Sequence, residues 1–262
     1  LGEIIYHYDP LYLRKVERFS PAHTLLYAHT YNTYDLSGNL LTENLINNLG
    51  PIQHTYDLKG QHTSLTSPYF SQVATYDPKG NLIHSTLDTH PHSYSYNALS
   101  QLTHEKAPTF SQTYSFDSLY NPAHSTNPLS ELTTQTYDPN GNQTELHNFQ
   151  LSYDPLHRLT SATNETTHIT FTYDPLGRRL SKTVSSQGFF GWSTTIQEEY
   201  LYNHDEEIAS FTPAGTPLTL KIQGLTSPIA IELNHLIHAP ILDMHFNIRH
   251  LIDPYWRTPT TS

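Results

Sequence analysis

The chain has no cysteine, so neither a disulfide bond nor a thiolate metal site stabilises its fold. It has no apolar run long enough to cross a bilayer, and its first residues lack the charged-then-apolar pattern of a secretion signal. Basic residues are scarce: 13 Lys and Arg stand against 24 Asp and Glu, which gives a formal net charge of −11. We therefore expect neither nucleic-acid binding nor a membrane span in this segment.

What the sequence has instead is a repeat. Ten pairs in which an aromatic residue precedes Asp or Asn recur along the chain, and the intervals between successive members of this set are 26, 22, 20, 20, 20, 21, 16, 20 and 29 residues. A fixed period indicates one supersecondary unit that is used repeatedly. The aromatic residues of the ten pairs are Tyr8, Tyr34, Tyr56, Tyr76, Tyr96, Phe116, Tyr137, Tyr153, Tyr173 and Tyr202.

The residues after each pair predict a tight turn. The clearest copies read Tyr-Asp-Pro-x-Gly, as at Tyr76 to Gly80. Asp is favoured at the first position of a type I turn and Pro at the second, and Gly accepts the left-handed conformation that closes a hairpin loop. Ser100, Tyr120 and His157 stand where the glycine is expected. We assign structural turn positions to Asp77, Gly80, Asp138, Gly141, Asp174 and Gly177.

The flanks of the turns alternate with the period of two that is typical of strands, as in Ile169, Phe171 and Tyr173. Each repeat then holds two strands and one tight turn, and no segment shows a helical stripe. The ten tandem hairpins supply roughly 20 strands. An open sheet rarely exceeds about 10 strands without curling, so this sheet must curve or close. The predicted fold class is all-β, with the hairpins forming a curved or spiral antiparallel sheet. Its aromatic ladder includes Tyr76, Tyr137, Tyr153 and Tyr173.

The pattern changes in two places. The segment 185–199 lengthens one interval, and we expect a long loop or hairpin in which Phe189, Phe190 and Trp192 fill a seam in the sheet. After Pro217 the chain becomes more apolar and has fewer turn signals. We divide the chain into a repeat array, 1–210, and a second β region, 211–262. The chain starts without Met and ends without an atypical capping repeat, so we expect it to be a truncated piece of a longer protein.

The tandem signature Tyr-Asp-x-x-Gly-Arg/Asn, seen at 137–142 and 173–178, resembles the YD repeats of Rhs proteins. Teneurins and the shell-forming components of insecticidal Tc toxins share these repeats. The resemblance covers about residues 1–210, and 240–253 resembles the start of the Rhs-associated core. It implies a spiral β-sheet shell, part of a YD-shell, which in bacterial members encapsulates a C-terminal toxic domain. The family's downstream Asp-Pro-x-Gly cleavage motif is missing, because Asp253-Pro254-Tyr255-Trp256 does not match it, so no autoproteolytic residue is assigned.

On this resemblance we expect a non-catalytic segment of a bacterial Rhs shell that encapsulates or presents a polymorphic toxin. Its partners would be the remainder of its own shell and a C-terminal toxin domain, and its location the outside or the envelope of a bacterium. The alternative is a cell-surface adhesion or carbohydrate-binding repeat protein, since stacked tyrosines suit sugar rings. A glycan array and the flanking reading frame distinguish the two.

The sequence does not favour metal binding or catalysis. Asp88, His90 and His92 fall at strand period, but Pro91 interrupts the strand and histidine is frequent, so we expect no metal site and no cofactor. The repeated aspartates are better explained as turn residues than as a catalytic pair, because a catalytic pair needs one special place. No Gly-x-Ser-x-Gly motif and no phosphate-binding glycine loop occurs. We therefore predict that this segment is not an enzyme.

Overall fold

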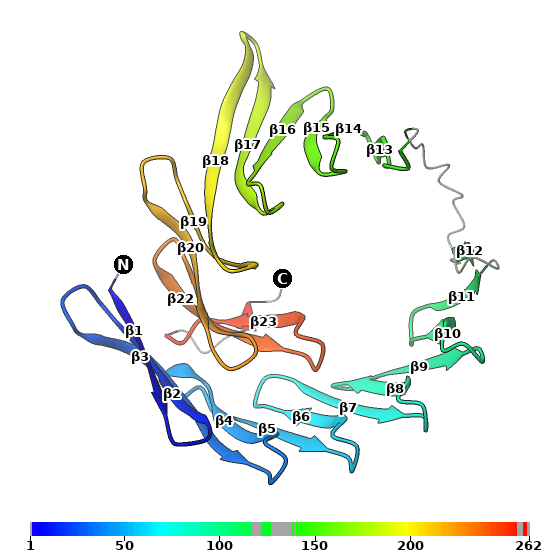
Figure 1. Cartoon of the computed structure of the whole chain (residues 1–262), viewed down its shortest axis with the longest axis vertical. Helices are drawn as coiled ribbons and strands as arrows, with labels where there is room; N and C mark the ends of the chain where they lie inside the picture. Colours follow the sequence, from blue (N-terminus) through cyan, green and yellow to red (C-terminus); the bar gives the residue numbers. More distant parts are fainter. Residues whose placement is uncertain (1, 117–121, 127–137, 139, 256–258, 261–262) are drawn as a thin grey trace. The chain divides into compact units, whose positions relative to one another are not determined.

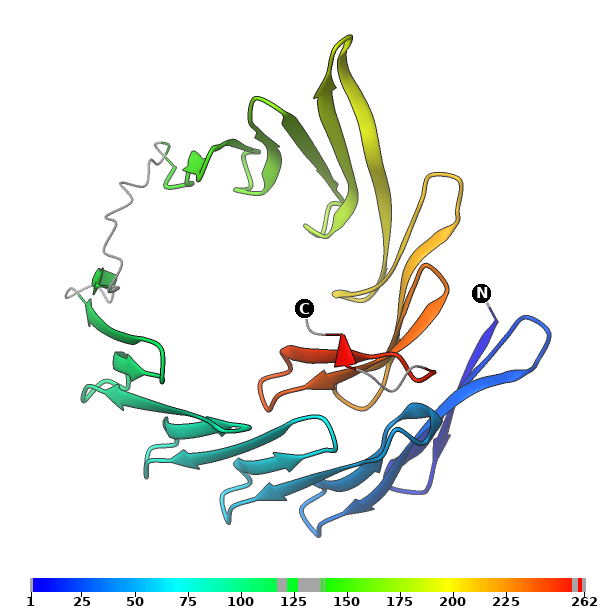
Figure 2. The ribbon, with the colours of Figure 1, turned by 180° about the vertical axis from the view of Figure 1, so that it is seen from behind.

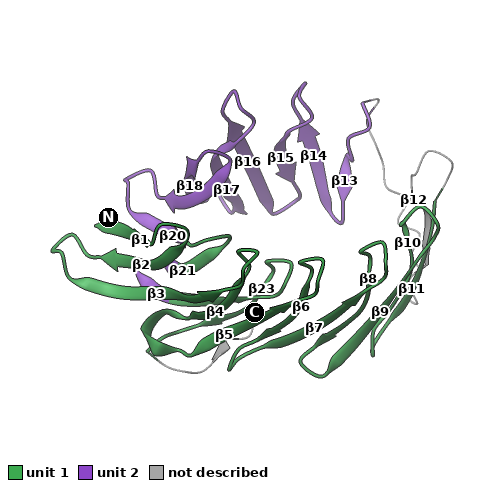
Figure 3. Ribbon diagram, turned by 60° about the horizontal axis from the view of Figure 1, so that its bottom comes forward, with its two compact units in different colours: residues 1–131, 223–230, 238–262 green, residues 132–222, 231–237 purple. Residues whose placement is uncertain are grey.

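The computed structural model describes residues 2–116, 122–126, 138, 140–255 and 259–260, and strands dominate them. Two compact units are formed (Figure 3): unit 1 comprises 1–131, 223–230 and 238–262, and unit 2 comprises 132–222 and 231–237. The described residues contain one three-residue 3-10 turn, so they include no helix with the length and hydropathy of a membrane span. The all-β prediction is confirmed.

Unit 1 is built on a sheet in which every strand pairs antiparallel with the next strand of the chain (Figure 1). Figure 3 shows that this sheet is curved. Its elements are β1 (Glu3–Tyr8), β2 (Leu13–Phe19), β3 (Leu25–Tyr34), β4 (Leu40–Asn44), the 3-10 turn η1 (Ile46–Asn48), β5 (Pro51–Tyr56), β6 (His62–Thr66), β7 (Ser71–Tyr76), β8 (Leu82–Leu87), β9 (His90–Tyr96), β10 (Leu102–Lys106), β11 (Ser111–Phe116) and β12 (Pro122–Thr126). Below, this sheet is called the wall.

Unit 2 repeats the same plan, with antiparallel pairing in chain order (Figure 2). Its strands are β13 (Glu145–Leu146), β14 (Phe149–Tyr153), β15 (Leu159–Thr163), β16 (Thr167–Tyr173), β17 (Arg179–Gly188), β18 (Gly191–Asn203), β19 (Glu206–Phe211) and β20 (Pro217–Gln223). The chain ends with β21 (Pro228–Leu233), β22 (Leu236–Leu242), β23 (Ile248–Ile252) and β24 (Pro259–Thr260). The tandem hairpins of the predicted fold class are therefore present in both units.

The turns between strands are held by the aspartate of each repeat. The Asp77 carboxylate accepts the backbone N–H of Lys79 at 2.8 Å and that of Asn81 at 2.9 Å, while the Gly80 N–H donates to the Asp77 carbonyl at 3.0 Å. Gly80 lies in the left-handed region with φ of 95°. The turns at Asp138 and Asp174 repeat this arrangement, with φ of 82° at Gly141 and 87° at Gly177.

Residues other than glycine adopt the same turn conformation. Ser100 and His157, which replace the expected glycine, both have φ of 61°, and Phe246 has φ of 63° in the turn that follows Asp243. Tyr120, the third replacement, lies outside the described residues. A left-handed conformation costs an L-residue about 1–2 kcal/mol, so the turn geometry is imposed by its hydrogen bonds even where glycine is absent.

Several tyrosines of the aromatic ladder bond their repeat to the one before it. The hydroxyl of Tyr76 donates to the carbonyl of His62 at 2.9 Å, and that of Tyr173 donates to the carbonyl of Leu159 at 2.7 Å. Tyr96 makes the corresponding bond to Leu82. The acceptor is in each case the residue that follows the previous turn, 14 positions earlier. Tyr153 lies at the end of β14 and is partly buried, and Tyr137 lies outside the described residues.

The core of unit 1 lies between the wall and an inner segment formed by residues 223–230 and 238–252. Backbone N–H groups of this segment bond to wall side chains: Leu225 donates to the Tyr31 hydroxyl and Met244 to the Gln72 Oε1, both at 2.9 Å. No pattern in the sequence predicts this return to the first hairpins. Whether the repeat array itself ends at residue 210 stays a prediction. Buried residues of the two layers include Val16, Tyr27, Ile52, Leu65 and Phe70 of the wall and Ile229, Ala239, Ile241 and Ile252 of the inner segment.

The lengthened repeat forms the β17–β18 hairpin. Phe189 and Phe190 at its tip are 97% and 99% exposed, and their rings meet edge to face with centroids 5.2 Å apart. Trp192 is about half exposed and contacts His168. The prediction that these aromatic side chains fill a seam in the sheet is wrong, because the register of β17 against β18 carries the tip residues into the turn, away from the sheet.

The turn geometry predicts opposite effects for two substitutions. Gly141→Val should lower the free energy of unfolding by about 1–3 kcal/mol, because valine resists φ of 82° and nothing lies within 4 Å of the added Cβ to compensate. Ser100→Gly should raise it by up to about 1 kcal/mol, because left-handed strain is relieved at some cost in chain entropy. Urea unfolding of both variants beside the parent chain measures this, and equal midpoints would contradict the turn assignment.

Candidate functional site

The six predicted turn residues lie at turn tips along the chain and do not converge on one site. Their carboxylates are used locally: hydrogen bonds from the side chain and backbone of Asn81 lower the pKa of Asp77. Asn142 lowers the pKa of Asp138 in the same way. At Asp174, burial raises the pKa, but the hydrogen bonds and charge of Arg178 outweigh it and lower the pKa overall. These acids are already ionised and engaged within their own turns.

The three residues weighed as a metal site line one hollow of unit 1 but do not form a ligand set. Asp88 accepts the backbone N–H of Ser71 at 2.8 Å, and His92 packs beside Tyr94 and Phe110. His90 is the first residue of β9 and lines the same hollow. Among the described residues, no group of three or more His, Asp or Glu side chains is placed to hold a metal ion.

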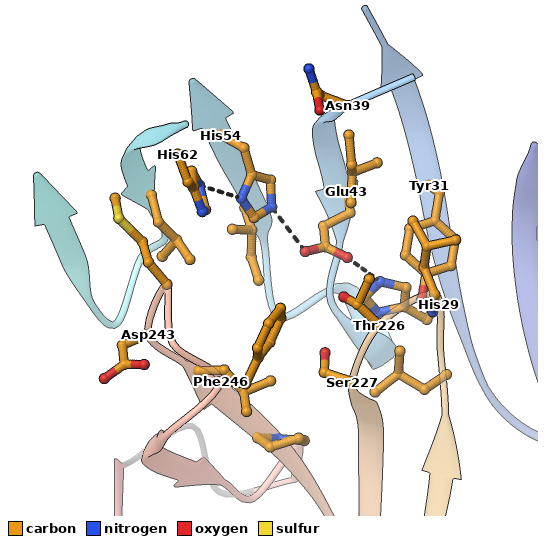
Figure 4. Close-up of a pocket in the computed structure, with 18 of the residues that line it drawn as sticks. His29, Tyr31, Asn39, Glu43, His54, His62, Thr226, Ser227, Asp243 and Phe246 are labelled. Atoms are coloured by element: carbon orange, nitrogen blue, oxygen red, sulfur yellow. Dashed lines mark hydrogen bonds and ion pairs between the residues drawn. The ribbon is translucent and has the colours of Figure 1, made fainter. Parts of the chain in front are cut away.

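A cavity of about 390 Å³ lies within unit 1, between wall strands β3 to β6 and the inner segment. On the wall side His29, Glu43, His54 and His62 line it, together with tyrosine and aliphatic side chains. On the other side lie residues 225–229 and the turn after β22, including Phe246. Figure 4 shows Glu43 between two histidines, with Phe246 across the cavity. This is the candidate functional site, because an apolar cavity with a few convergent polar groups is the usual form of a ligand site.

The polar residues of the cavity form one hydrogen-bonded row. His29 Nε2 lies 2.7 Å from Glu43 Oε2, and His54 Nε2 lies 3.0 Å from Glu43 Oε1. His62 Nε2 continues the row at 3.1 Å from His54 Nδ1. Pairing places Glu43 of β4 opposite Ile52 and Tyr31, and β6 pairs with β5, so four neighbouring strands supply the row. The cluster thus depends on the register of hairpins and not on any local motif.

The environment shifts the pKa of several of these groups. Burial raises the pKa of the Glu43 carboxyl, but the hydrogen bonds from His29 and His54 outweigh burial and lower it to about 2. Burial lowers the pKa of His62 to about 4, and the neighbouring His54 adds to this effect. Burial and the Glu43 charge raise the pKa of Tyr31 and Tyr56. Glu43 is therefore an ionised carboxylate inside the protein.

The inner segment presents a second acid to the cavity, and this acid is neutralised locally. Asp243 is almost fully buried, with 1% of its side chain exposed, and its carboxylate lies 2.8 Å from Arg249. It also accepts the backbone N–H groups of His245 and Asn247, as the wall aspartates do in their turns. Asp243 thus holds the turn that places Phe246 in the cavity. Among the described residues, the partners of the Glu43 carboxylate are the histidines His29 and His54.

Sequence reasoning missed this cluster. Glu43 and the three histidines carry no spacing that is typical of a site, and 18 histidines hide any single one. The nearest signal is the pair His54 and Tyr56, which share one strand face at the end of a repeat. Only the pairing of β3, β4 and β5 brings His29, Glu43 and His54 together.

Comparisons with known proteins agree with the repeat. Residues 153–189, which include the pairs at Tyr153 and Tyr173, match the family described as RHS Repeat. The fold is also that of three crystal structures, TcdB2-TccC3-TEV, TcdB2-TccC3, and TcdB2-TccC3 without its hypervariable C-terminal region. Each match covers 96% of this chain at 14% identity, with TM-scores of 0.63, 0.62 and 0.63. Comparison with curated proteins gives no significant match.

The chain spans only 17% or 18% of the length of those structures. Its strands and turns define a tandem β-hairpin repeat protein. The family match and the shared fold together confirm the resemblance to the Rhs/YD-repeat family. At this level of identity the structural likeness shows the fold alone.

The shifted pKa values predict that acid destabilises unit 1 in two steps. Unfolded His62 binds its proton near its ordinary pKa of 6.5, whereas folded His62 binds it only near 4, so stability falls as pH falls through that window. Unfolded Glu43 binds its proton near 4.5 and folded Glu43 near 2, so a second loss follows between those values.

His62→Gln should therefore flatten the decline in the urea midpoint between pH 6.5 and 4. The control is His84→Gln on β8, which removes an exposed histidine from the same unit and should leave the slope unchanged. Parallel curves for His62→Gln and the parent chain would show that His62 is not the titrating group.

Proposed function

We propose that this chain is a non-catalytic wall segment of a bacterial Rhs-type β-shell that encapsulates or presents a C-terminal polymorphic toxin domain. Its partners are then the rest of the same shell and that toxin domain, and its place is outside the cell or in the cell envelope. The observation that carries the proposal is the alignment of 96% of the chain with part of the TcdB2-TccC3 structures.

The hairpin plan supports a wall. Each strand inside a sheet pairs along both edges with its neighbours in the chain, so a sheet of this kind grows by adding hairpins at its ends without a change of topology. The tyrosine hydroxyls then bond one repeat to the previous one. The number of repeats sets the width of such a sheet. A wide, curved sheet is suited to enclosing a volume.

The chemistry of the repeats supports a structural role. Asp77, Asp138 and Asp174 each accept two backbone N–H groups of their own turn, so their oxygens are occupied by the fold. A hydrolytic pair of carboxylates requires two acids that face one substrate bond. The repeated aspartates lie one to a turn, which favours a scaffold over a glycosidase.

Limited proteolysis of the full-length gene product tests the proposal. A C-terminal domain beyond the shell should resist protease, and a double substitution in one turn of each unit, Gly80→Val with Gly177→Val, should make it sensitive, because both glycines have positive φ. The isolated C-terminal domain serves as the unprotected control. A gene product without such a domain, or one whose domain is cut as fast as the isolated domain, would contradict encapsulation.

A further inference from the structure

We propose that the cavity of unit 1 binds a small organic cation, a protonated primary amine on an apolar body, with Glu43 as its counter-ion. This inference concerns the cavity alone and does not rest on the proposed shell role. Each requirement of such a ligand, namely charge, hydrogen-bond acceptors, aromatic surface and room, is met by a separate feature of the described residues.

The first feature is an unbalanced buried charge. Glu43 is ionised and 13% exposed, and among the described residues that line the cavity there is no Lys or Arg. The other acid of the lining, Asp243, is paired with Arg249. The hydrogen bonds from His29 and His54 stabilise the Glu43 carboxylate, and its negative charge attracts a cation that enters the cavity.

The second feature is an excess of acceptors. An ionised carboxylate only accepts hydrogen bonds, so the Nε2 atoms of His29 and His54 must carry the protons of the bonds to Glu43. With His29 neutral, its Nδ1 is then a lone-pair acceptor, and this buried atom has no partner among the residues that the structure describes. His29 as a whole is 2% exposed. An ammonium group, which carries three donors and no acceptor, complements such a site.

The third feature is the surface of the cavity. The rings of Tyr31, Tyr56 and Phe246 line it, and aromatic faces attract cations. Aliphatic side chains such as Ile52 and Leu65 complete the lining and suit an apolar body. Its volume of about 390 Å³ falls within the range of small-molecule pockets, roughly 300–1,000 Å³.

Calorimetric titration of the 262-residue chain in mildly alkaline buffer tests the proposal with a matched pair of probes, 2-phenylethylamine and its neutral analogue 2-phenylethanol. The amine should bind with a Kd of about 1 mM or tighter and the alcohol at least about tenfold more weakly. Glu43→Gln should weaken amine binding by about tenfold or more, whereas Glu165→Gln, an exposed carboxylate outside the cavity, should leave it unchanged.

A second variant covers the case in which Glu43→Gln fails to fold. Thr226 is an exposed residue at the rim of the cavity, so Thr226→Trp should obstruct entry while leaving Glu43 and its histidines intact. It should reduce amine binding to the level of the alcohol. Equal affinity for the two probes, no binding of the amine, or full amine binding by Thr226→Trp would each overturn the assignment.

Discussion

The structure depends on one interaction that recurs in every well-formed repeat: an aspartate carboxylate that accepts backbone N–H groups two and four residues further along. At Asp77 these donors are Lys79 and Asn81, and the same set recurs at Asp35, Asp57, Asp138, Asp154, Asp174 and Asp243. The bonds satisfy backbone donors that a tight turn leaves free. They fix where each strand reverses, and so they fix the register of the strands on either side.

The strand register then determines which side chains meet, both in the aromatic ladder and in the cavity. A slip by one residue would turn each strand over and carry its tyrosines to the other face, so the bond from Tyr173 to the Leu159 carbonyl depends on correct turns. The same register places Glu43 opposite Ile52 and brings His54 within reach. The cavity is in this sense a product of the repeat, although Glu43 and its three histidines lie outside the repeated motif.

The sequence predicted the local structure because its signals are local. Asp-Pro-x-Gly specifies a turn through the backbone preferences of consecutive residues, and the alternation of apolar and polar residues specifies strands. The hairpins and their order along the chain could therefore be predicted. The return of residues 223–230 and 238–252 to the first hairpins joins residues up to about 200 positions apart, and no periodicity encodes such contacts. The histidine row around Glu43 likewise follows from strand pairing and from no repeated spacing. The exposed tip at Phe189 and Phe190 was misjudged for a related reason: aromatic character predicts burial, but position in a turn overrides it.

The most direct test of the central claim is hydrogen exchange of backbone amides in Asp77→Ala compared with the parent chain. The account predicts that the amides of Lys79 and Asn81, which donate to the Asp77 carboxylate, are protected in the parent chain and exchange much faster in the variant. The neighbouring turn at Asp57 should keep its own protection. Unchanged protection of both amides in Asp77→Ala would contradict the claim that the aspartate holds the turn.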